Sequence, residues 1–146
     1  MHVGSPATED DYNRAVEQLS RRIADVIGSR SDVVAAYLFG STIRGDAHPN
    51  SDVDVAVLFD RPQPATLDAP RFVLEGDLER ALGKPVDLIV LNDVPVDLRI
   101  RVMREGCLLV DRVPGARIAF EVRTRNEAFD IEPVLTRYRA ARSHTG

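Results

Sequence analysis

The sequence predicts an α/β (α+β) fold, in which helices flank a small mixed sheet. Three observations carry this prediction. Apolar runs of strand length recur along the chain, amphipathic segments with helical spacing separate them, and clusters of Gly, Pro, Asn and Asp mark the turns. The chain has 146 residues, of which 44% are hydrophobic, so it can bury a core. We therefore expect one domain over residues 1–146, with residues 115–146 as a C-terminal helical tail.

The first helix is predicted by apolar residues at helical spacing, and it ends at Gly28 and Ser29. These apolar residues are Tyr12, Val16, Leu19, Ile23, Val26 and Ile27. Thr8 is placed to cap the first turn of this helix. The apolar run DVVAAYLF, residues 32–39, predicts the first strand, which the sequence Gly-Ser-Thr breaks. The polar residues 43–51 then predict a loop, with or without a short helix.

A strand, a helix and another strand follow this loop. Residues 52–59 predict the second strand, and three prolines in residues 60–70 predict a loop after it. Residues 71–83 predict an amphipathic helix, and residues 84–91 predict the third strand. The apolar face of that helix is expected to consist of Phe72, Leu74, Leu78, Ala81 and Leu82.

The last part of the chain predicts a helix at residues 94–106, a short strand at residues 107–111 and the helical tail. Pro133 is expected to interrupt the tail, because proline removes a backbone donor inside a helix. The tail also carries more apolar surface than one terminal helix readily hides, so it is expected to contribute to partner binding. Its apolar residues are Ile118, Phe120, Val122, Phe129, Ile131, Val134, Leu135 and Tyr138.

Charge and cysteine content narrow the function classes. The net charge of −4 argues against a dedicated nucleic-acid-binding module and against a protein that binds anionic membranes. Cys107, the single cysteine, cannot form an internal disulfide, which favours a reducing compartment. No apolar run reaches the roughly 18 to 20 residues that cross a bilayer, and the acidic N-terminus does not resemble a signal peptide. We therefore expect a soluble, cytoplasmic protein.

Three aspartates interrupt strands that otherwise read as buried. Asp52 and Asp54 are two residues apart, so they point to the same face of the second strand. Asp87 lies in the third strand and joins them if the two strands are neighbours. Carboxylates this close repel each other, by about 4 kcal/mol per pair at 4 Å and an effective dielectric of 20. A hard divalent cation, above all Mg²⁺, would relieve that repulsion. The plainer alternatives are a turn residue at Asp52 and a strand entrance at Asp87.

The pair Gly40 and Ser41 follows the first strand directly. A turn of this kind presents backbone N–H groups in a row, and such turns bind phosphate. Gly40 would let a phosphate approach the backbone closely, while Ser41 would add a hydroxyl donor. Most Gly-Ser pairs are simply turns. A phosphate site beside a Mg²⁺ site, however, is what a nucleoside triphosphate requires.

The string FGSTIRGDAHPNSDVDVAVLF, residues 39–59, resembles the motif of the DNA polymerase β-like nucleotidyltransferase superfamily. It is most similar to the minimal nucleotidyltransferases, which share the Arg-Gly at Arg44 and Gly45 and the Ser-Asp at Ser51 and Asp52. The third carboxylate of that family matches Asp87. The resemblance covers residues 10–111 and is specific over residues 39–59. It implies the polymerase β-like fold in a single minimal nucleotidyltransferase domain.

The same resemblance implies transfer of a nucleoside monophosphate from ATP with release of pyrophosphate. Asp52, Asp54 and Asp87 would be the catalytic residues and the ligands of two Mg²⁺ ions. Asp87 would either lower the pKa of the incoming hydroxyl or accept its proton. Gly40 and Ser41 would bind the β- and γ-phosphates. Arg44 would neutralise the leaving pyrophosphate, unless it is an ordinary solvated loop arginine.

The resemblance also implies an acceptor. Stand-alone minimal members are typically antitoxins that bind a HEPN-domain RNase toxin and adenylylate one of its tyrosines. We therefore expect a hetero-oligomer with such a toxin, and no direct contact with nucleic acid or a membrane. Two alternatives stay open. One is a small-molecule nucleotidyltransferase that acts on an aminoglycoside-like acceptor, and the other is a non-catalytic module that binds ATP or a toxin.

Other candidate sites are weaker. His2, His48 and His144 lack metal-ligand spacing, although His48 lies in the motif loop. Cys107 has no histidine nearby in sequence and is expected to be a small core residue. The arginines at positions 99, 101 and 104 are expected to form a solvated helix face.

Overall fold

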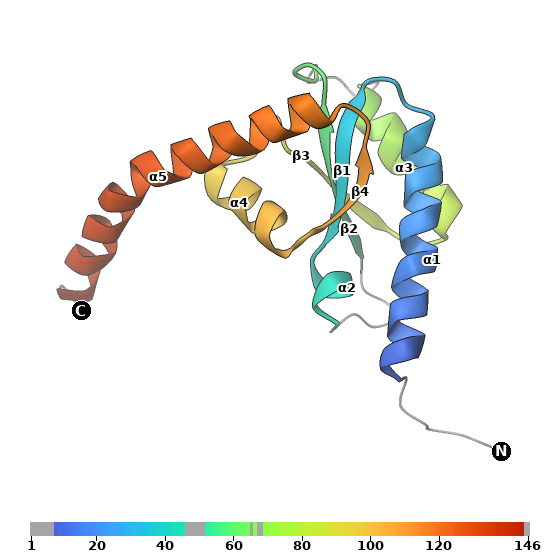
Figure 1. The fold of residues 1–146 in the computed structure, drawn as a ribbon, viewed down its shortest axis with the longest axis horizontal. Coiled ribbons are helices and arrows are strands. Elements are labelled where there is room, and N and C mark those ends of the chain that lie inside the picture. Colours follow the sequence, from blue (N-terminus) through green and yellow to red (C-terminus); the bar gives the residue numbers. More distant parts are fainter. Residues whose placement is uncertain (1–7, 46–51, 65, 67–68, 145–146) are drawn as a thin grey trace.

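In this computed structural model, residues 8–45, 52–64, 66 and 69–144 are described, with side chains left out for Arg44 and residues 131–144. Helices and strands follow the predicted order, with a short helix after the first strand (Figure 1). The elements are α1 (Glu9–Gly28), β1 (Val33–Phe39), α2 (Ser41–Arg44), β2 (Val53–Phe59), α3 (Pro70–Leu82), β3 (Val86–Val90), α4 (Val96–Glu105), β4 (Cys107–Asp111) and α5 (Pro114–His144).

The four strands form one mixed sheet in the order β3-β2-β1-β4. Strand β1 pairs antiparallel with both β2 and β4, whereas β2 and β3 run parallel. The parallel pair has α3 as its crossover, as parallel strands require a long connection. The second and third strands are therefore neighbours, which is the condition for Asp87 to lie near the aspartates of the second strand.

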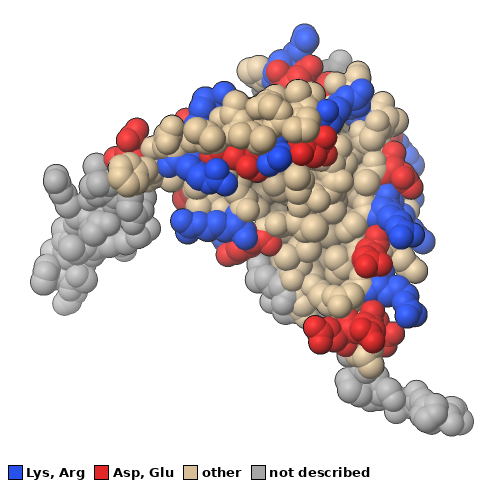
Figure 2. Space-filling model, in the orientation of Figure 1, with Lys and Arg blue, Asp and Glu red and all other residues tan. Residues whose placement is uncertain are grey.

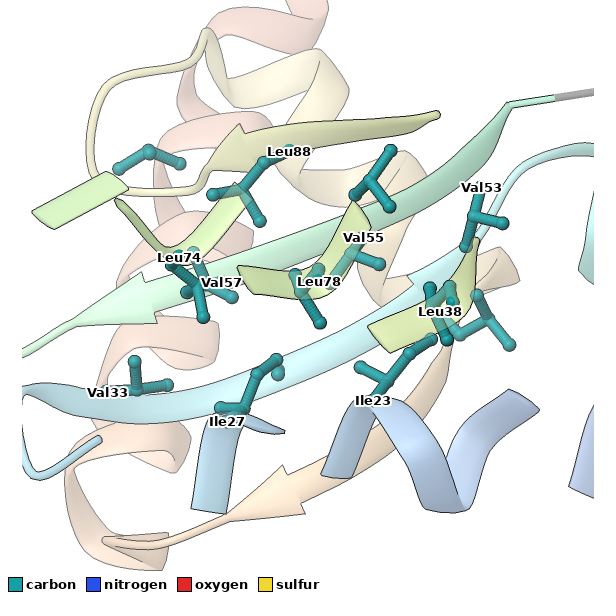
Figure 3. Packing of buried hydrophobic residues seen from close by; sticks show 14 of the residues in the cluster. Ile23, Ile27, Val33, Leu38, Val53, Val55, Val57, Leu74, Leu78 and Leu88 are labelled. Atoms are coloured by element: carbon teal, nitrogen blue, oxygen red, sulfur yellow. The ribbon is translucent and has the colours of Figure 1, made fainter. Parts of the chain in front are cut away.

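Helices α1 and α3 cover one face of the sheet. Thr8 caps α1, where its side chain accepts a hydrogen bond from the backbone N–H of Asp11 and the Asp11 carboxylate accepts one from the N–H of Thr8. Side chains from both helices point at alternate residues of the strands (Figure 3). The helices contribute Ile23 and Ile27 from α1 and Leu74 and Leu78 from α3. Strand β2 contributes Val53, Val55 and Val57.

The apolar face predicted for α3 needs a correction. Leu74, Leu78 and Leu82 are buried as expected, but Phe72 is 42% exposed and Ala81 is also exposed. Helix α3 packs on α1 and on the edge strand β3, and the three leucines, at a spacing of four residues, form its buried side. The Arg71 guanidinium lies 5.2 Å from the centre of the Phe72 ring.

Helix α4 and the first half of α5 cover the opposite face. Val102 and Phe120 pack there on Tyr37, Ala56 and Leu58. The solvated arginine face predicted for α4 is wrong at its first member, Arg99. This side chain is 19% exposed, its guanidinium donates to the carbonyl oxygens at positions 91 and 92, and it lies 5.5 Å from the centre of the Phe120 ring. Arg101 and Arg104 are exposed, as expected.

Helix α5 continues through Pro133 without interruption, contrary to the sequence expectation. Proline weakens a helix by removing one donor and crowding the preceding turn, and the common result is a bend. Figure 1 shows that the second half of α5 turns away from the direction of the first half. The tail is therefore one bent helix, and its first half is fixed on the sheet by Phe120 and Thr124, which are both buried.

Strand β4 is an edge strand with an exposed surface. Cys107 is exposed on it, so the expectation that this cysteine belongs to the core was wrong. Leu108 beside it is 39% exposed. Figure 2 shows charged side chains along α1 and α5 and a largely uncharged surface between them. Within the described residues, no helix has both the length and the apolar character needed to cross a membrane.

Candidate active site

Two of the three aspartates face each other across the parallel strands. Asp54 on β2 and Asp87 on β3 are partners in register. Their neighbours Val53, Val55, Val86 and Leu88 pack on the α1 and α3 side, so strand alternation directs both aspartates to the opposite face. Neighbouring strands lie about 4.8 Å apart, which brings the two carboxylates within reach of one shared ion. Asp54 is half-buried and Asp87 is exposed.

Gly40 lies directly against the Asp54 carboxylate. Phe39, the last residue of β1, pairs with Asp54 in the sheet, so the turn that follows passes over that side chain. A Cβ placed on Gly40 would overlap Oδ2 of Asp54 and would lie 2.8 Å from its Cγ. Gly40 also has φ +79° and ψ −150°, a backbone region that is essentially restricted to glycine. Both constraints require glycine at this position.

Ser41 begins the short helix α2 and is half-buried. It therefore lies one residue beyond the contact between Gly40 and Asp54, next to the aspartate pair. The predicted phosphate-binding turn and the predicted metal ligands thus occupy one end of the sheet, where β1 ends and β2 and β3 begin. A triphosphate held at the turn would lie beside the carboxylates.

Asp52 and Arg44 are less completely placed. Asp52 is exposed immediately before β2, and a backbone hydrogen bond of 3.0 Å from Val53 to Pro85 holds the entrances of β2 and β3 together. Arg44 is the last residue of α2, but its side chain is outside the description. His48 lies in residues 46–51, which are also outside the described residues.

The donor set fits a hard divalent cation. Carboxylate oxygens are the ligands that Mg²⁺ prefers, and the ion usually takes only one or two of them from the protein, with substrate phosphates and water completing its shell. No group of three or more Asp, Glu, His or Cys side chains that could hold a metal is found among the described residues. The binding of Mg²⁺ by Asp52, Asp54 and Asp87 therefore stays a prediction.

One residue near this site was missed by the sequence analysis. The hydroxyl of Tyr12, on α1, lies 2.5 Å from the carbonyl oxygen of Thr42 and 2.9 Å from that of Ile43. The helical spacing of apolar residues in α1 predicted only that Tyr12 lies on the apolar face of this helix. Its contact partners lie 30 and 31 residues later in the chain, so local spacing holds no signal for them.

Comparison with known families decides the class of protein. The sequence profile of the family "Polymerase beta, Nucleotidyltransferase" matches residues 21–114, which is more than half of the chain. The chain belongs to this nucleotidyltransferase family. The match contains Gly40, Ser41, Asp52, Asp54 and Asp87, and it ends where α5 begins.

Two curated proteins are similar to this nucleotidyltransferase. A Methanocaldococcus jannaschii protein named "Putative protein adenylyltransferase" is 31% identical over 91 residues, covering 62% of this chain and 94% of that protein. The protein adenylyltransferase MntA of Shewanella oneidensis is 41% identical over 71 residues, covering 48% of each chain.

Solved structures share the fold. A chain in the crystal structure of a toxin-antitoxin with AMP-PNP is 25% identical, with a TM-score of 0.64, and the alignment covers 82% of this nucleotidyltransferase and 97% of that chain. A chain from the complex of a tri-AMPylated Shewanella oneidensis HEPN toxin with its MNT antitoxin is 21% identical and has a TM-score of 0.60. That alignment covers 84% of this chain and 97% of the other.

Proposed function

We propose that this nucleotidyltransferase transfers AMP from ATP to a tyrosine hydroxyl of a HEPN-type toxin and thereby acts as an antitoxin. One observation carries the proposal. Asp54 and Asp87 are in register on parallel strands, and the Gly40 turn lies against Asp54. This arrangement would combine metal ligands with a phosphate-binding turn, as a nucleoside triphosphate requires. A cytoplasmic setting, which the single cysteine favours, is part of the same proposal.

Each residue has a role in the proposed transfer. The Ser41 hydroxyl and the backbone at Gly40 bind the β- and γ-phosphates, and Arg44 neutralises the leaving pyrophosphate. Asp52, Asp54 and Asp87 would hold Mg²⁺, which supplies positive charge to the triphosphate. The tyrosine oxygen attacks the α-phosphorus, and the bond from that phosphorus to the bridging oxygen of pyrophosphate breaks. Asp87 accepts the tyrosine proton, for which its exposed position leaves access.

The proposed partner follows from the relatives. The named relatives are protein adenylyltransferases, and the structural neighbours come from toxin-antitoxin complexes, one of them with an AMPylated HEPN toxin. An acceptor supplied by a second protein therefore suits this chain better than a small molecule.

ATP labelled at different phosphates tests the reaction. The chain is incubated with Mg²⁺ and the product of the neighbouring reading frame, and label on the protein partner is measured. Label from the α-phosphate is expected on the partner, and none from the γ-phosphate, because pyrophosphate leaves. The variant Asp54→Asn serves as the inactive control. Transfer of γ-label would contradict the proposal, and so would transfer to an aminoglycoside but not to the protein. ATP binding without any transfer would leave only the non-catalytic alternative.

A further inference from the structure

Tyr12 connects the N-terminal helix to the turn that carries the proposed phosphate ligands. Its phenol group crosses from α1 to α2, where the hydroxyl donates toward the carbonyl oxygens of Thr42 and Ile43, at 2.5 Å and 2.9 Å. The ring also lies beside Gly45, the residue that ends α2, since a Cβ there would be 3.8 Å from Cζ of Tyr12. Tyr12 therefore contacts the C-terminal end of α2 through both its hydroxyl and its ring.

Helix α2 cannot maintain its own conformation. It has only four residues, and a backbone hydrogen bond of 3.1 Å from the N–H of Gly45 to the carbonyl oxygen of Ser41 closes its last turn. Helix nucleation is unfavourable, so one turn needs support from its surroundings. Glycines in positive-φ conformations bound it on both sides, Gly40 at φ +79° and Gly45 at φ +82°. The orientation of α2 therefore depends on tertiary contacts.

Three contacts supply that support. At the first end, Gly40 fits against the Asp54 carboxylate. In the middle, Ile43 packs against the main core cluster. At the last end, the carbonyl oxygens of Thr42 and Ile43 lie beyond the Gly45–Ser41 hydrogen bond, and within the described part of the chain the Tyr12 hydroxyl is the side-chain donor that reaches them. Removing this donor releases one end of α2 and leaves the other two supports in place.

We propose that Tyr12 is a positioning residue for nucleotide binding. By fixing the last turn of α2, it holds Ser41 and the preceding Gly40 turn in the orientation that receives the triphosphate. This inference rests on the proposed function, because it concerns the same site. It adds to that function a residue outside the motif and outside the matched range 21–114. Tyr12 acts through α2 and not on the reacting atoms.

The positioning role predicts a specific kinetic pattern. Loss of one hydrogen bond to α2 should lower ATP affinity by about three- to tenfold. The carboxylates on β2 and β3 are untouched, so the turnover rate at saturating ATP should stay close to that of the wild type. A rise in KM for ATP with a nearly constant kcat is therefore expected. A general loss of folded protein would instead lower the apparent kcat.

The variant Tyr12→Phe tests this role, because it removes the hydroxyl and keeps the ring. Tyr37→Phe is the matched control, since it removes a hydroxyl that bonds to Glu121 on the face covered by α5. ATP affinity is measured by calorimetric titration, the thermal midpoint is recorded for each variant, and amide hydrogen exchange is followed over residues 41–45. Weaker ATP binding and faster exchange at these amides are expected for Tyr12→Phe and not for Tyr37→Phe.

The outcomes separate this inference from the proposed function. If Tyr12→Phe binds ATP as tightly as the wild type, or exchanges its α2 amides no faster, the positioning role is overturned while the function stands. An equal loss of affinity in Tyr37→Phe would also overturn it, because the effect would then reflect stability. Failure of the wild-type protein to bind ATP with Mg²⁺ would instead contradict the proposed function.

Discussion

The contact between Gly40 and Asp54 leaves no room for a side chain at position 40. The variant Gly40→Ala must place a methyl group against the Asp54 carboxylate and hold an L-residue at φ +79°. The backbone strain alone costs about 1 to 3 kcal/mol. We expect a lower free energy of unfolding in urea and loss of ATP binding, because the turn or Asp54 has to move.

Gly28→Ala is the matched control for this substitution. Gly28 is the last residue of α1, and a Cβ there meets no atom within 4 Å. Its replacement is expected to change the free energy of unfolding by no more than about 1 kcal/mol and to leave ATP binding unchanged. If both variants behave alike, the close approach of Gly40 to Asp54 has no role in nucleotide binding.

A substitution at Asp87 tests its proposed role in catalysis separately from ATP binding. The variant Asp87→Asn keeps the size of the side chain but removes its charge and basicity, so ATP binding is expected to persist while AMP transfer falls by about 10²-fold or more. Single-turnover assays with α-labelled ATP measure this loss. Asp93→Asn, at an exposed residue after β3, is the control and should transfer normally. Near-normal turnover of Asp87→Asn would remove this residue from the mechanism.

Helix α5 is attached to the sheet by a partly buried polar network. The hydroxyl of Tyr37 donates to Oε1 of Glu121 at 2.7 Å, and Arg117 bonds to Glu121 at 3.1 Å and to Asp111 at 2.9 Å. Burial, followed by the hydrogen bond and charge of Glu121, raises the pKa of Tyr37 well above its usual value near 10. Because the folded state keeps the Tyr37 hydroxyl protonated at high pH, the free energy of unfolding depends on pH.

The alkaline stability of the protein should therefore depend on Tyr37. As the pH rises past about 10, the tyrosine of the unfolded chain loses its proton while the folded one retains it, so the free energy of unfolding falls. Below that pH the contribution is complete. Urea unfolding between pH 8 and pH 11 should show a steeper fall for the wild type than for Tyr37→Phe. Equal slopes would mean that Tyr37 titrates alike in both states.

Two phenylalanines on α5 test which part of this helix belongs to the core. Phe120 is 6% exposed and Phe129 is 79% exposed. Phe120→Ala is expected to cost about 3 to 5 kcal/mol of stability, whereas Phe129→Ala should stay within about 0.5 kcal/mol. Thermal and urea unfolding of both variants measures the difference. Similar losses in the two variants would contradict the arrangement of α5 on the sheet.

The same helix keeps its predicted role in partner binding. Ile118, Val122 and Phe129 are all exposed and share one side of α5, since their spacing is close to whole helical turns. The first half of α5 packs on the sheet through its other side, so truncation at Gly115 would expose core residues and could not isolate an interface. Phe129→Ala is the cleaner probe, and weaker binding of the toxin by this folded variant is the expected result.

At the scale of the whole molecule, the proposed metal site and the main core lie on opposite faces of the sheet. The main core packs between the sheet and helices α1 and α3, while Asp54 and Asp87 face the other way. Removal of Mg²⁺ with EDTA should therefore weaken ATP binding without lowering the thermal midpoint of the free protein. Titrations of ATP with and without Mg²⁺ measure the first effect. Equal affinities would contradict a metal-bridged nucleotide.

Most of the fold could be predicted because local patterns and tertiary contacts agree. The strands, the cap at Thr8 and the end of the first helix follow from spacing and turn chemistry. The pairing of Asp54 with Asp87 could be predicted only as a condition, because sequence alternation gives the face of a strand but not the identity of its neighbour. The family resemblance supplied the remaining site residues, and their roles stay predictions.

Two of the wrong expectations and one missed residue share a physical cause, which is that distant contacts overrode local preference. Arg99 reads as a solvated helix residue, but the carbonyl oxygens at positions 91 and 92 and the ring of Phe120 hold it in place. Cys107 is small and apolar in character, yet it falls on an edge strand. Tyr12 acts on residues about 30 positions later. None of these partners can be identified from the neighbouring residues alone.

The position of β4 at the edge of the sheet has a consequence for biosynthesis. Strand β1, at residues 33–39, pairs with β4 on one side. That side of β1 therefore stays unpaired during synthesis until residues 107–111 have been made. At 5–20 residues per second, that interval lasts roughly 4 to 14 s on the ribosome. During it, β1 presents an unpaired apolar edge that can pair with other nascent chains. Overproduction of this protein should therefore benefit from slower initiation or from chaperones that shield nascent strands.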